Sequence, residues 1–494
     1  MNAIFKKPLF YTLILVIFVI ISISEYEKTY NVQHNLNPSI DFIVKSDISK
    51  SSKPFKQYKN QTRYGSIYKK VQKSDELIEK EKNDSEQDGP DKALEQDFYR
   101  TMNLELKRPT PELLPSIVNK NYLKLQSNKI ALAIPGSSSN APWVELGPNN
   151  VGGRTRTITW DPNDSTGKKV WAGGVTGGLW YNNDITNNSS SWNKVDDFWQ
   201  TLSITKIVFD SIDKKTAYVT TGESFGTSAS IGAGIWKTTN AGATWSQLSS
   251  TSNFLYSNDL VIRTESGKSV IYAAIDASFY MGKWLNASNA GLYRSTDNGT
   301  TWTQTLPNIT DTANTNKVPF VAASIQISKN NTIWIGTKAS PYGNKNRGGG
   351  YVLKSTNGIN WTVVNKFNVT NGTGRVTIAV APSNEKILYA FVESSGKLEN
   401  LYRSDDEGVT WNTLTKPLDA DINMASADFT NGQAGYNQSM AVDPNNPNIV
   451  IVGGIDLFKT INFDGCEYVQ VEYGIEEYSS YQLIHKENCR NHKN

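Results

Sequence analysis

From about residue 155 onwards the chain alternates apolar and polar residues over short runs, a pattern that predicts β-strands. Two sets of such runs recur. The first set reads TITWDP, KIVFDS, DLVIRT, ASIQIS, TIAVAP and SMAVDP, and the second reads KVWAGG, TAYVTT, VIYAAI, TIWIGT, ILYAFV and NIVIVG. Turn residues such as Asp161-Pro162-Asn163 join some of the pairs. The chain therefore carries six predicted pairs of neighbouring antiparallel strands.

Four short segments follow these pairs and end on a tryptophan. They read KTTNAGATW, RSTDNGTTW, KSTNGINW and RSDDEGVTW, and the third is one residue shorter. Degenerate copies lie at residues 178–192 and 458–465. The four tryptophans recur every 50 to 59 residues, which is typical of propeller blades. We therefore predict an all-β fold, a β-propeller of four-stranded antiparallel blades, of which six are countable.

Each segment predicts a tight turn. Its Asn or Asp can accept backbone N–H bonds, its Gly can adopt a positive φ, and its Trp can pack between strands or blades. We expect structural roles, and no metal binding, for Asn240, Gly242, Trp245, Asp297, Gly299, Trp302, Asn357, Gly358, Trp361, Asp406, Gly408 and Trp411.

The ends of the propeller region, residues 141–460, predict how the ring closes. PWVELG at residues 142–147 reads like an outer strand, so we expect it to complete the last blade and remove open edges. The tail, residues 461–494, leaves the repeat. It is interpreted as a cap or as the remnant of a longer protein.

The region before the propeller predicts export. Lys6 and Lys7 precede an apolar run, so residues 1–24 are interpreted as a signal peptide or, alternatively, a retained membrane anchor. Residues 25–140 form a charged, mostly disordered linker in this interpretation, with a short helix near residues 91–106. The protein is expected to be secreted or at the cell surface, with membrane contact only through an uncleaved N-terminus.

Composition narrows the chemistry. The 50 basic and 47 acidic residues nearly cancel, which argues against nucleic-acid binding. The three histidines, His34, His485 and His492, lie outside the propeller region. Catalysis in the propeller would therefore use carboxylates, Tyr or Lys. We expect no cofactor and a monomer.

The repeated segments resemble the Asp box, S/T-x-D/N-x-G-x-T-W, of sialidases, sortilin-type receptors, xyloglucan-specific endoglucanases and a photosystem assembly factor. The resemblance implies seven or more blades, so six can be an incomplete set. In xyloglucanases it implies a catalytic Asp before a Gly-Gly pair, but Val175 stands there in WAGGVTGGLW. Sialidases open on Arg-Ile-Pro, whereas this propeller opens on GGRTRTI. Arg154 and Arg375 are expected to bond carbonyls or carboxylates between blades.

Long connections after the second and outer strands share one face and are the expected binding surface. They span residues 223–233, 276–290, 338–349 and 418–438. Candidate ligand-binding aromatics on them are Phe225, Phe279, Tyr280, Trp284 and Tyr342. Glu223, Asp276 and Glu393 follow second strands and are the candidate catalytic carboxylates, since glycoside hydrolysis needs two.

Two functions follow from these residues. The first is an exported, sortilin-like and non-catalytic binding module for a polypeptide or a glycan. The alternative is a glycoside hydrolase of the Asp-box propeller type that acts on β-glucans such as xyloglucan. A structural or adhesion module without a discrete ligand is a third interpretation, because fold does not determine function.

Overall fold

The computed structural model describes residues 90–128, 153–196, 199–225, 229–280, 283–309, 318–340, 347–419, 427–460, 468–471 and 483–484. All of them belong to one compact unit, Arg63–Asn494. The expected signal or anchor and Tyr342 lie outside the described residues, as does the segment 142–147. No helix among the described residues is long and apolar enough to cross a membrane.

Two helices precede the propeller. The first, α4 (Pro90–Thr101), begins where the sequence predicts a helix but ends earlier than expected. The Asn103 side chain accepts the backbone N–H groups of Glu105 and Leu106, each at 3.0 Å, which favours a turn over another helical residue. Short strands β1 (Met102–Asn103) and β2 (Arg108–Pro109) pair across that turn. A second helix, α5 (Leu114–Asn128), follows η2 (Pro111–Leu113) and was not expected from the sequence.

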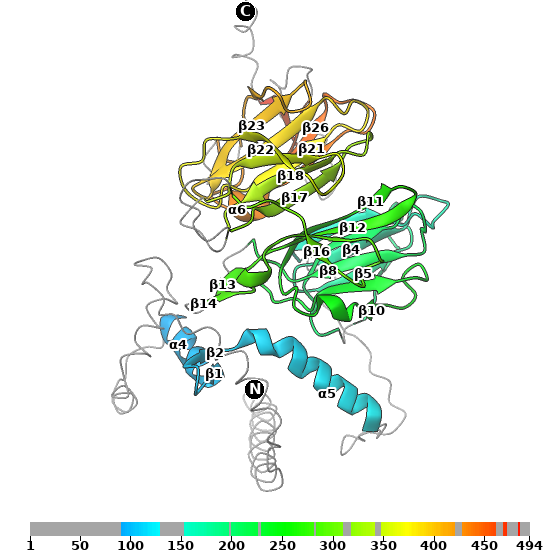
Figure 1. Ribbon diagram of the computed structural model, residues 1–494, viewed down its shortest axis with the longest axis vertical. Helices are drawn as coiled ribbons and strands as arrows, with labels where there is room; N and C mark the ends of the chain where they lie inside the picture. The colour runs from blue at the N-terminus through cyan, green and yellow to red at the C-terminus, as the bar shows by residue number, and fades with distance from the viewer. Residues whose placement is uncertain are drawn as a thin grey trace, which may run out of the picture. The chain divides into compact units, whose positions relative to one another are not determined.

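Six antiparallel sheets follow in chain order, and each is a blade of the propeller. Figure 1 shows them running from the green β4 to the orange β26. Blade 1 has β3 (Thr155–Trp160), β4 (Val170–Gly174), β5 (Gly178–Asn182) and β6 (Trp192–Lys194); blade 2 has β7 (Ile204–Phe209), β8 (Ala217–Thr221), β9 (Ile235–Thr238) and β10 (Ser246–Gln247); blade 3 has β11 (Ser257–Glu265), β12 (Lys268–Ile275), β15 (Gly291–Ser295) and β16 (Thr303–Gln304). The predicted strand pairs are thereby confirmed.

The remaining blades repeat this meander. Blade 4 has β17 (Val321–Ile327), β18 (Ile333–Lys338), β19 (Tyr351–Ser355) and β20 (Thr362–Lys366); blade 5 has β21 (Val376–Val380), β22 (Leu388–Ser394), β23 (Lys397–Ser404) and β24 (Asn412–Thr413); blade 6 has β25 (Ser439–Val442), β26 (Val450–Gly453), β27 (Leu457–Thr460), β28 (Tyr468–Val471) and the additional β29 (Leu483–Ile484). Short elements η3 (Ser249–Thr251), η4 (Ala287–Asn289), α6 (Ala434–Asn437) and the hairpin β13 (Ser278–Tyr280)–β14 (Lys283–Leu285) lie in connections.

The fourth strand of blade 6 differs from the expectation. Its place beside β27 is taken by β28, whose Val471 pairs with Leu457. The strand therefore comes from the C-terminal tail, in the position that we expected residues 142–147 to fill. The tail contributes to the repeat because Tyr468–Val471 is itself a short alternating segment that can pair on both sides.

The four tryptophan segments form equivalent turns, here called the repeat turns (residues 238–245, 295–302, 355–361 and 404–411). Their glycines have φ between 71° and 88°, as predicted. The indole Nε1 of Trp245, Trp302 and Trp411 donates to the carbonyl of the glycine three residues earlier, at 2.9 to 3.1 Å. In the shorter third turn, Trp361 Nε1 has no such partner among the described residues.

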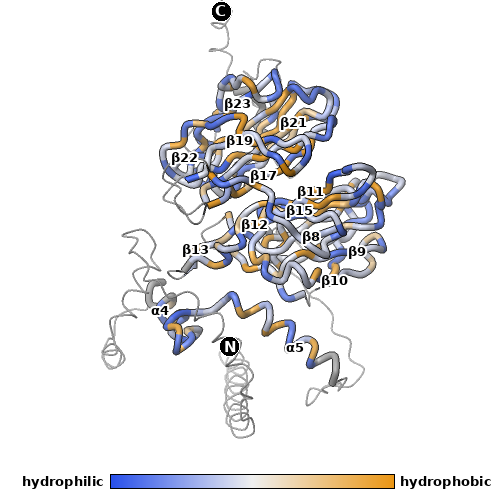
Figure 2. The backbone as a smooth tube through the Cα atoms, viewed as in Figure 1, coloured by the Kyte–Doolittle hydropathy of each residue, from blue (hydrophilic) through white to orange (hydrophobic). Residues whose placement is uncertain are grey.

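Apolar clusters join successive blades at five junctions. Blades 1 and 2 share Trp171, Ile207 and Trp236, and equivalent clusters join blades 2 and 3, 3 and 4, 4 and 5, and 5 and 6. Figure 2 shows the apolar positions concentrated on the strands, with mostly hydrophilic turns between them. Glycines at the repeat turns permit close contact, since a Cβ on Gly242 would lie 2.4 Å from the ring of Trp171.

The junction of blade 6 with blade 1 is different. Trp171 pairs with Thr159 and faces blade 2, so Ile158 and Trp160 lie on the opposite face of blade 1. These two side chains are 67% and 58% exposed. On the outer face of blade 6, Ile451 is 40% exposed. Among the described residues no apolar cluster joins blade 6 to blade 1, and the polar contacts from this end of blade 1 go to Tyr436 in the segment that leads from blade 5 into blade 6.

Candidate functional site

Charged residues gather where the second strands end and the inner strands begin. The antiparallel register brings these ends together, as in the pairs Thr155↔Gly174 and Val376↔Val392. Glu223, Asp276, Lys338 and Glu393 come from the second-strand ends of blades 2 to 5, and Arg154, Arg156 and Arg375 come from the inner-strand starts of blades 1 and 5. We call this side of the propeller, with its long connections, the long-loop face.

Glu223 pairs with Arg156 across the junction of blades 1 and 2. Arg156 Nη2 lies 3.0 Å from Glu223 Oε1, and the Glu223 side chain is fully buried. The same oxygen accepts the backbone N–H of Phe225 at 2.8 Å. The other carboxylate oxygen, Oε2, has no hydrogen-bond partner among the described residues. A buried carboxylate of this kind depends on its cation.

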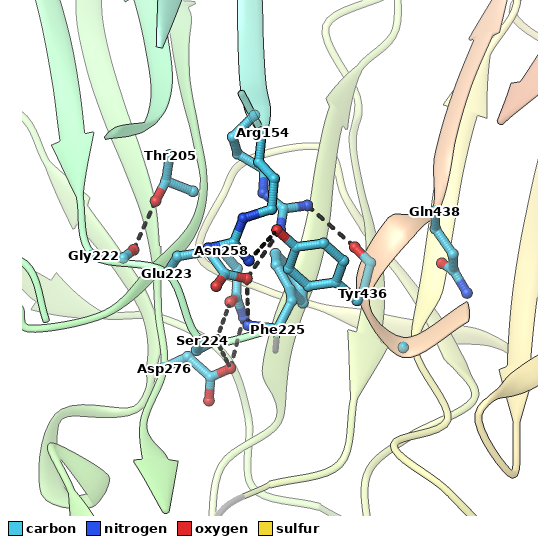
Figure 3. Close-up of polar contacts among 12 residues, drawn as sticks. Arg154, Thr205, Gly222, Glu223, Ser224, Phe225, Asn258, Asp276, Tyr436 and Gln438 are labelled. Carbon is cyan, nitrogen blue, oxygen red and sulfur yellow. Dashed lines mark hydrogen bonds and ion pairs between the residues drawn. The ribbon is translucent and has the colours of Figure 1, made fainter. Parts of the chain in front are cut away.

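Asp276 is the centre of a buried polar network. Its Oδ2 accepts bonds from Lys338 Nζ at 2.6 Å, Ser224 Oγ at 2.7 Å and Asn258 Nδ2 at 3.0 Å. Its Oδ1 accepts the N–H of Ala277 at 2.7 Å. Figure 3 shows dashed lines that join Ser224, Asn258 and Asp276, to the left of Phe225. The network fixes the ends of blades 2, 3 and 4 to each other.

Glu393 holds a turn of blade 5 instead. Its Oε2 accepts the N–H and hydroxyl of Thr373 at 2.9 and 2.6 Å, and its Oε1 accepts the N–H of Gly396 at 2.6 Å. The residue is 1% exposed. All three predicted catalytic carboxylates are thus buried and bonded within the protein. Ser224, the residue after Glu223 in the chain, bonds Asp276, whereas Glu393 has its own set of partners.

Phe225 lies among three cationic side chains of the long-loop face. The guanidinium carbon of Arg375 is 3.8 Å from its ring centroid, and the charged groups of Arg156 and Lys338 lie at 5.4 and 5.2 Å. These are cation–π distances. Figure 3 places Phe225 beside Tyr436, between the strands of the early blades and those of the late blades. Phe225 is therefore part of a packed centre and does not stand free in a loop.

The other predicted aromatics lie on the hairpin β13–β14. Phe279 pairs with Trp284 in the strand register, with ring centroids 5.3 Å apart at 64°. Phe279 is 38% exposed, and Tyr280 is half-buried. Asn286 Nδ2 donates to the carbonyl of Asp276 at 2.8 Å and so ties this connection to the buried network. The hairpin projects an aromatic pair from the long-loop face.

Tyr436 in α6 connects blade 1 with the segment that enters blade 6. Its carbonyl accepts Arg156 Nη1 at 3.1 Å and Arg375 Nη1 at 2.9 Å, and its hydroxyl accepts Arg154 Nη1 at 3.0 Å. Arg375 also donates to the carbonyls of Gly435 and Gln438. Burial, together with the nearby Arg156, lowers the pKa of Arg375 to about 9. The prediction that Arg375 bonds carbonyls between blades is thus confirmed, whereas Arg154 bonds a hydroxyl instead of the expected carbonyl or carboxylate.

Sequence reasoning missed several members of this site. Lys338 follows its second strand at nearly the place where the acids follow theirs, so the repeat alignment contained a signal for it. Ser224, Asn258 and Tyr436 carried no signal, because only folding brings them to the charged groups. Among the described residues, no three His, Cys, Asp or Glu side chains are grouped so that they could hold a metal ion.

Fold and site together define a six-bladed β-propeller with a polar centre on one face. Solved structures with a similar fold include a GH74 enzyme of Niastella koreensis (19% identity, TM-score 0.46, covering 64% of this chain and 50% of that one) and a GH74 xyloglucanase of Xanthomonas campestris (16%, 0.39, 64% and 52%). A third is YCF48 bound to a D1 peptide (14%, 0.38, 64% and 82%). The match spans about half the length of both GH74 chains. No family model and no curated protein matches the sequence.

Proposed function

We propose that this chain is an exported, non-catalytic propeller of the Asp-box class, sortilin-like in use, that binds an extended polypeptide on its long-loop face. The proposal depends on the burial and the hydrogen bonds of Glu223, Asp276 and Glu393. Each is buried and bonded to the protein's own donors. A catalytic acid or base must instead reach the substrate. The surface groups left for a ligand are arginines and aromatics, which are typical of binding sites.

The hairpin β13–β14 supports a polypeptide as the ligand. It is a two-stranded sheet, so within the described residues its outer edges have no strand partner. An extended peptide can add to such an edge through main-chain hydrogen bonds. Phe279 and Trp284 on the same hairpin offer apolar area for its side chains. The loop is fixed at its base by Asn286, which limits the ordering cost of binding.

The test is to immobilise the full chain and challenge it with a random twelve-residue peptide display library and with a glycan array. We expect peptides to be enriched and the double variant Phe279→Ser/Trp284→Ser to lose at least about tenfold in affinity, roughly 1.4 kcal/mol. Trp192→Ser is the matched control, because Trp192 is a comparably exposed aromatic, 43% accessible, on the outer strand of blade 1. Enrichment of glycans alone would replace the polypeptide by a carbohydrate ligand.

The alternative function is hydrolysis of a β-glucan such as xyloglucan by two of the three carboxylates. One observation favours it, namely the unpartnered Oε2 of Glu223, which could act as the general base that accepts a proton from the attacking water while a second carboxylic acid protonates the leaving oxygen. The assay is release of reducing ends from xyloglucan by the full chain. Turnover that disappears in Glu223→Gln and persists in Glu393→Gln would establish this activity and end the non-catalytic proposal.

A further inference from the structure

The charges of one group of side chains on the long-loop face, here called the mouth, do not balance. The mouth consists of Arg154, Arg156, Lys338, Arg375, Glu223, Asp276 and Glu393. Arg156 is paired with Glu223 and Lys338 with Asp276. Arg154 and Arg375 have no carboxylate partner in the described part of the chain, since their guanidinium groups donate to Tyr436 and to carbonyls. The carboxylate of Glu393 bonds the backbone of Arg375 and not its side chain. The mouth therefore carries a surplus of positive charge.

Hydrogen-bond donors at the mouth are also in surplus. The Nε atoms of Arg156 and Arg375 are buried and have no acceptor among the described residues. A buried donor without an acceptor destabilises the folded protein. Arg154 is exposed, and the Tyr436 hydroxyl accepts from it without donating to any described residue. A negatively charged acceptor that enters here would relieve both the charge and the donor surplus.

The aromatic rings at the mouth are poorly placed for a neutral sugar. A sugar would stack on a ring face, but Arg375 covers Phe225 at 3.8 Å. The ring of Tyr436 has Arg156 at 4.6 Å and Arg154 at 5.6 Å. A guanidinium fork instead matches the two oxygens of a carboxylate. The mouth thus favours an acidic group over a neutral ring.

We propose that Arg154 and Arg156, with the hydroxyl of Tyr436, form a carboxylate site, and that the polypeptide bound by the long-loop face is acidic. This inference rests on the proposed function and adds the chemistry that selects the ligand. Arg154 is the principal contact, because it is exposed and holds no carboxylate. Arg156 contributes charge while it stays bonded to Glu223. The acidic side chain of the peptide replaces water at the mouth, and no covalent step is involved.

The experiment uses the full chain and two labelled twelve-residue peptides, one of alternating Ser and Glu and one in which Gln replaces every Glu. Fluorescence anisotropy at low salt is expected to show the Glu peptide binding at least about tenfold more tightly, because a hydrogen bond to a charged group is stronger than one to a neutral group. Arg154→Gln should abolish most of that preference. Lys214→Gln removes an equal charge from an exposed turn on the opposite face and should preserve it.

The possible outcomes distinguish the carboxylate site from the proposed function. Equal affinity for the two peptides, or a loss as large in Lys214→Gln as in Arg154→Gln, would overturn the carboxylate site. If the Glu peptide fails to bind while neutral peptides are enriched from the display library, the carboxylate site is wrong and the proposed function stands. If no peptide binds at all, the proposed function itself fails. Oligogalacturonate is included as a fourth probe, and its binding in place of the Glu peptide would assign the site to acidic glycans.

Discussion

Five junctions of this propeller are apolar, and the sixth is polar. Between blades 1 and 2, Trp171 and Trp245 pack with ring centroids 6.1 Å apart at 72°, and four similar clusters follow around the ring. Between blade 1 and the segment that enters blade 6, the described contacts are those of Arg154 and Arg156 with Tyr436. Apolar burial is non-directional and contributes most of the stability. Polar contacts are directional, so they contribute less than apolar burial to the stability of a junction but more to its chemical specificity.

The candidate site lies at the polar junction and not at an apolar one. The charged mouth lies between blade 1 and the segment that leads from blade 5 into blade 6, and Arg156 there contacts Glu223, Phe225 and Tyr436. The apolar faces of Ile158 and Trp160 remain exposed beside it. A ring that is rigid at five junctions supports a charged site at the sixth, in keeping with function on a rigid scaffold.

The largest expected change in stability comes from replacing a tryptophan on the buried face of blade 1, compared with a tryptophan on its exposed face. Trp171 is 1% exposed, and its Nε1 donates to Asp161 at 3.0 Å. Trp171→Ala should lower the free energy of unfolding by about 3 to 5 kcal/mol, because it leaves a large cavity. Trp160→Ala on the exposed face should cost under about 1 kcal/mol. Urea unfolding followed by circular dichroism measures both, and equal losses would refute the comparison of the two junctions.

A smaller effect is expected from the ion pair at the polar junction. Arg156→Gln leaves the fully buried Glu223 without its cation, which should lower the free energy of unfolding by about 2 to 3 kcal/mol. This is slightly below the usual cost of breaking a buried ion pair, because the Arg156 side chain is 15% exposed. The double variant Arg156→Gln/Glu223→Gln should recover part of that loss, since the unpaired charge is gone. If the losses of the two single variants simply add in the double variant, the pair has no coupling and Arg156 acts through packing alone.

The sequence predicted the repeating architecture well because each blade is encoded locally. Alternation in the inner and second strands, and one turn with Gly and Trp, recur within each unit, so neighbouring residues suffice. Blade closure was less predictable: Val471 in the tail pairs with Leu457, although the Trp-led residues 142–147 look more like an outer strand. The mouth was not predictable, because Arg156 and the carbonyl of Tyr436 are separated by 280 residues. Such contacts depend on how the ring closes.

The smallest effect should come from the repeat turns, which lie in blades 2 to 5 beside the apolar junctions. Hydrogen bonds from the hydroxyl and backbone of Thr301 lower the pKa of Asp297 to about 2, and those from Thr410 do the same for Asp406. In the unfolded chain an Asp titrates near 3.9. The carboxylates therefore stabilise the fold above about pH 4, and this contribution is lost as the pH falls towards 2.

Asn240 occupies the same place in another repeat turn, where its side-chain oxygen accepts the N–H of Thr244 at 2.9 Å. An amide can thus replace the carboxylate without removing this bond. The double variant Asp297→Asn/Asp406→Asn should lose less stability than the wild type between pH 4 and pH 2, with little change at pH 7. Urea midpoints measured at several pH values test this. Parallel curves for the two proteins would mean that the turns do not titrate with folding, and acid sensitivity would then have to arise at the charged junction.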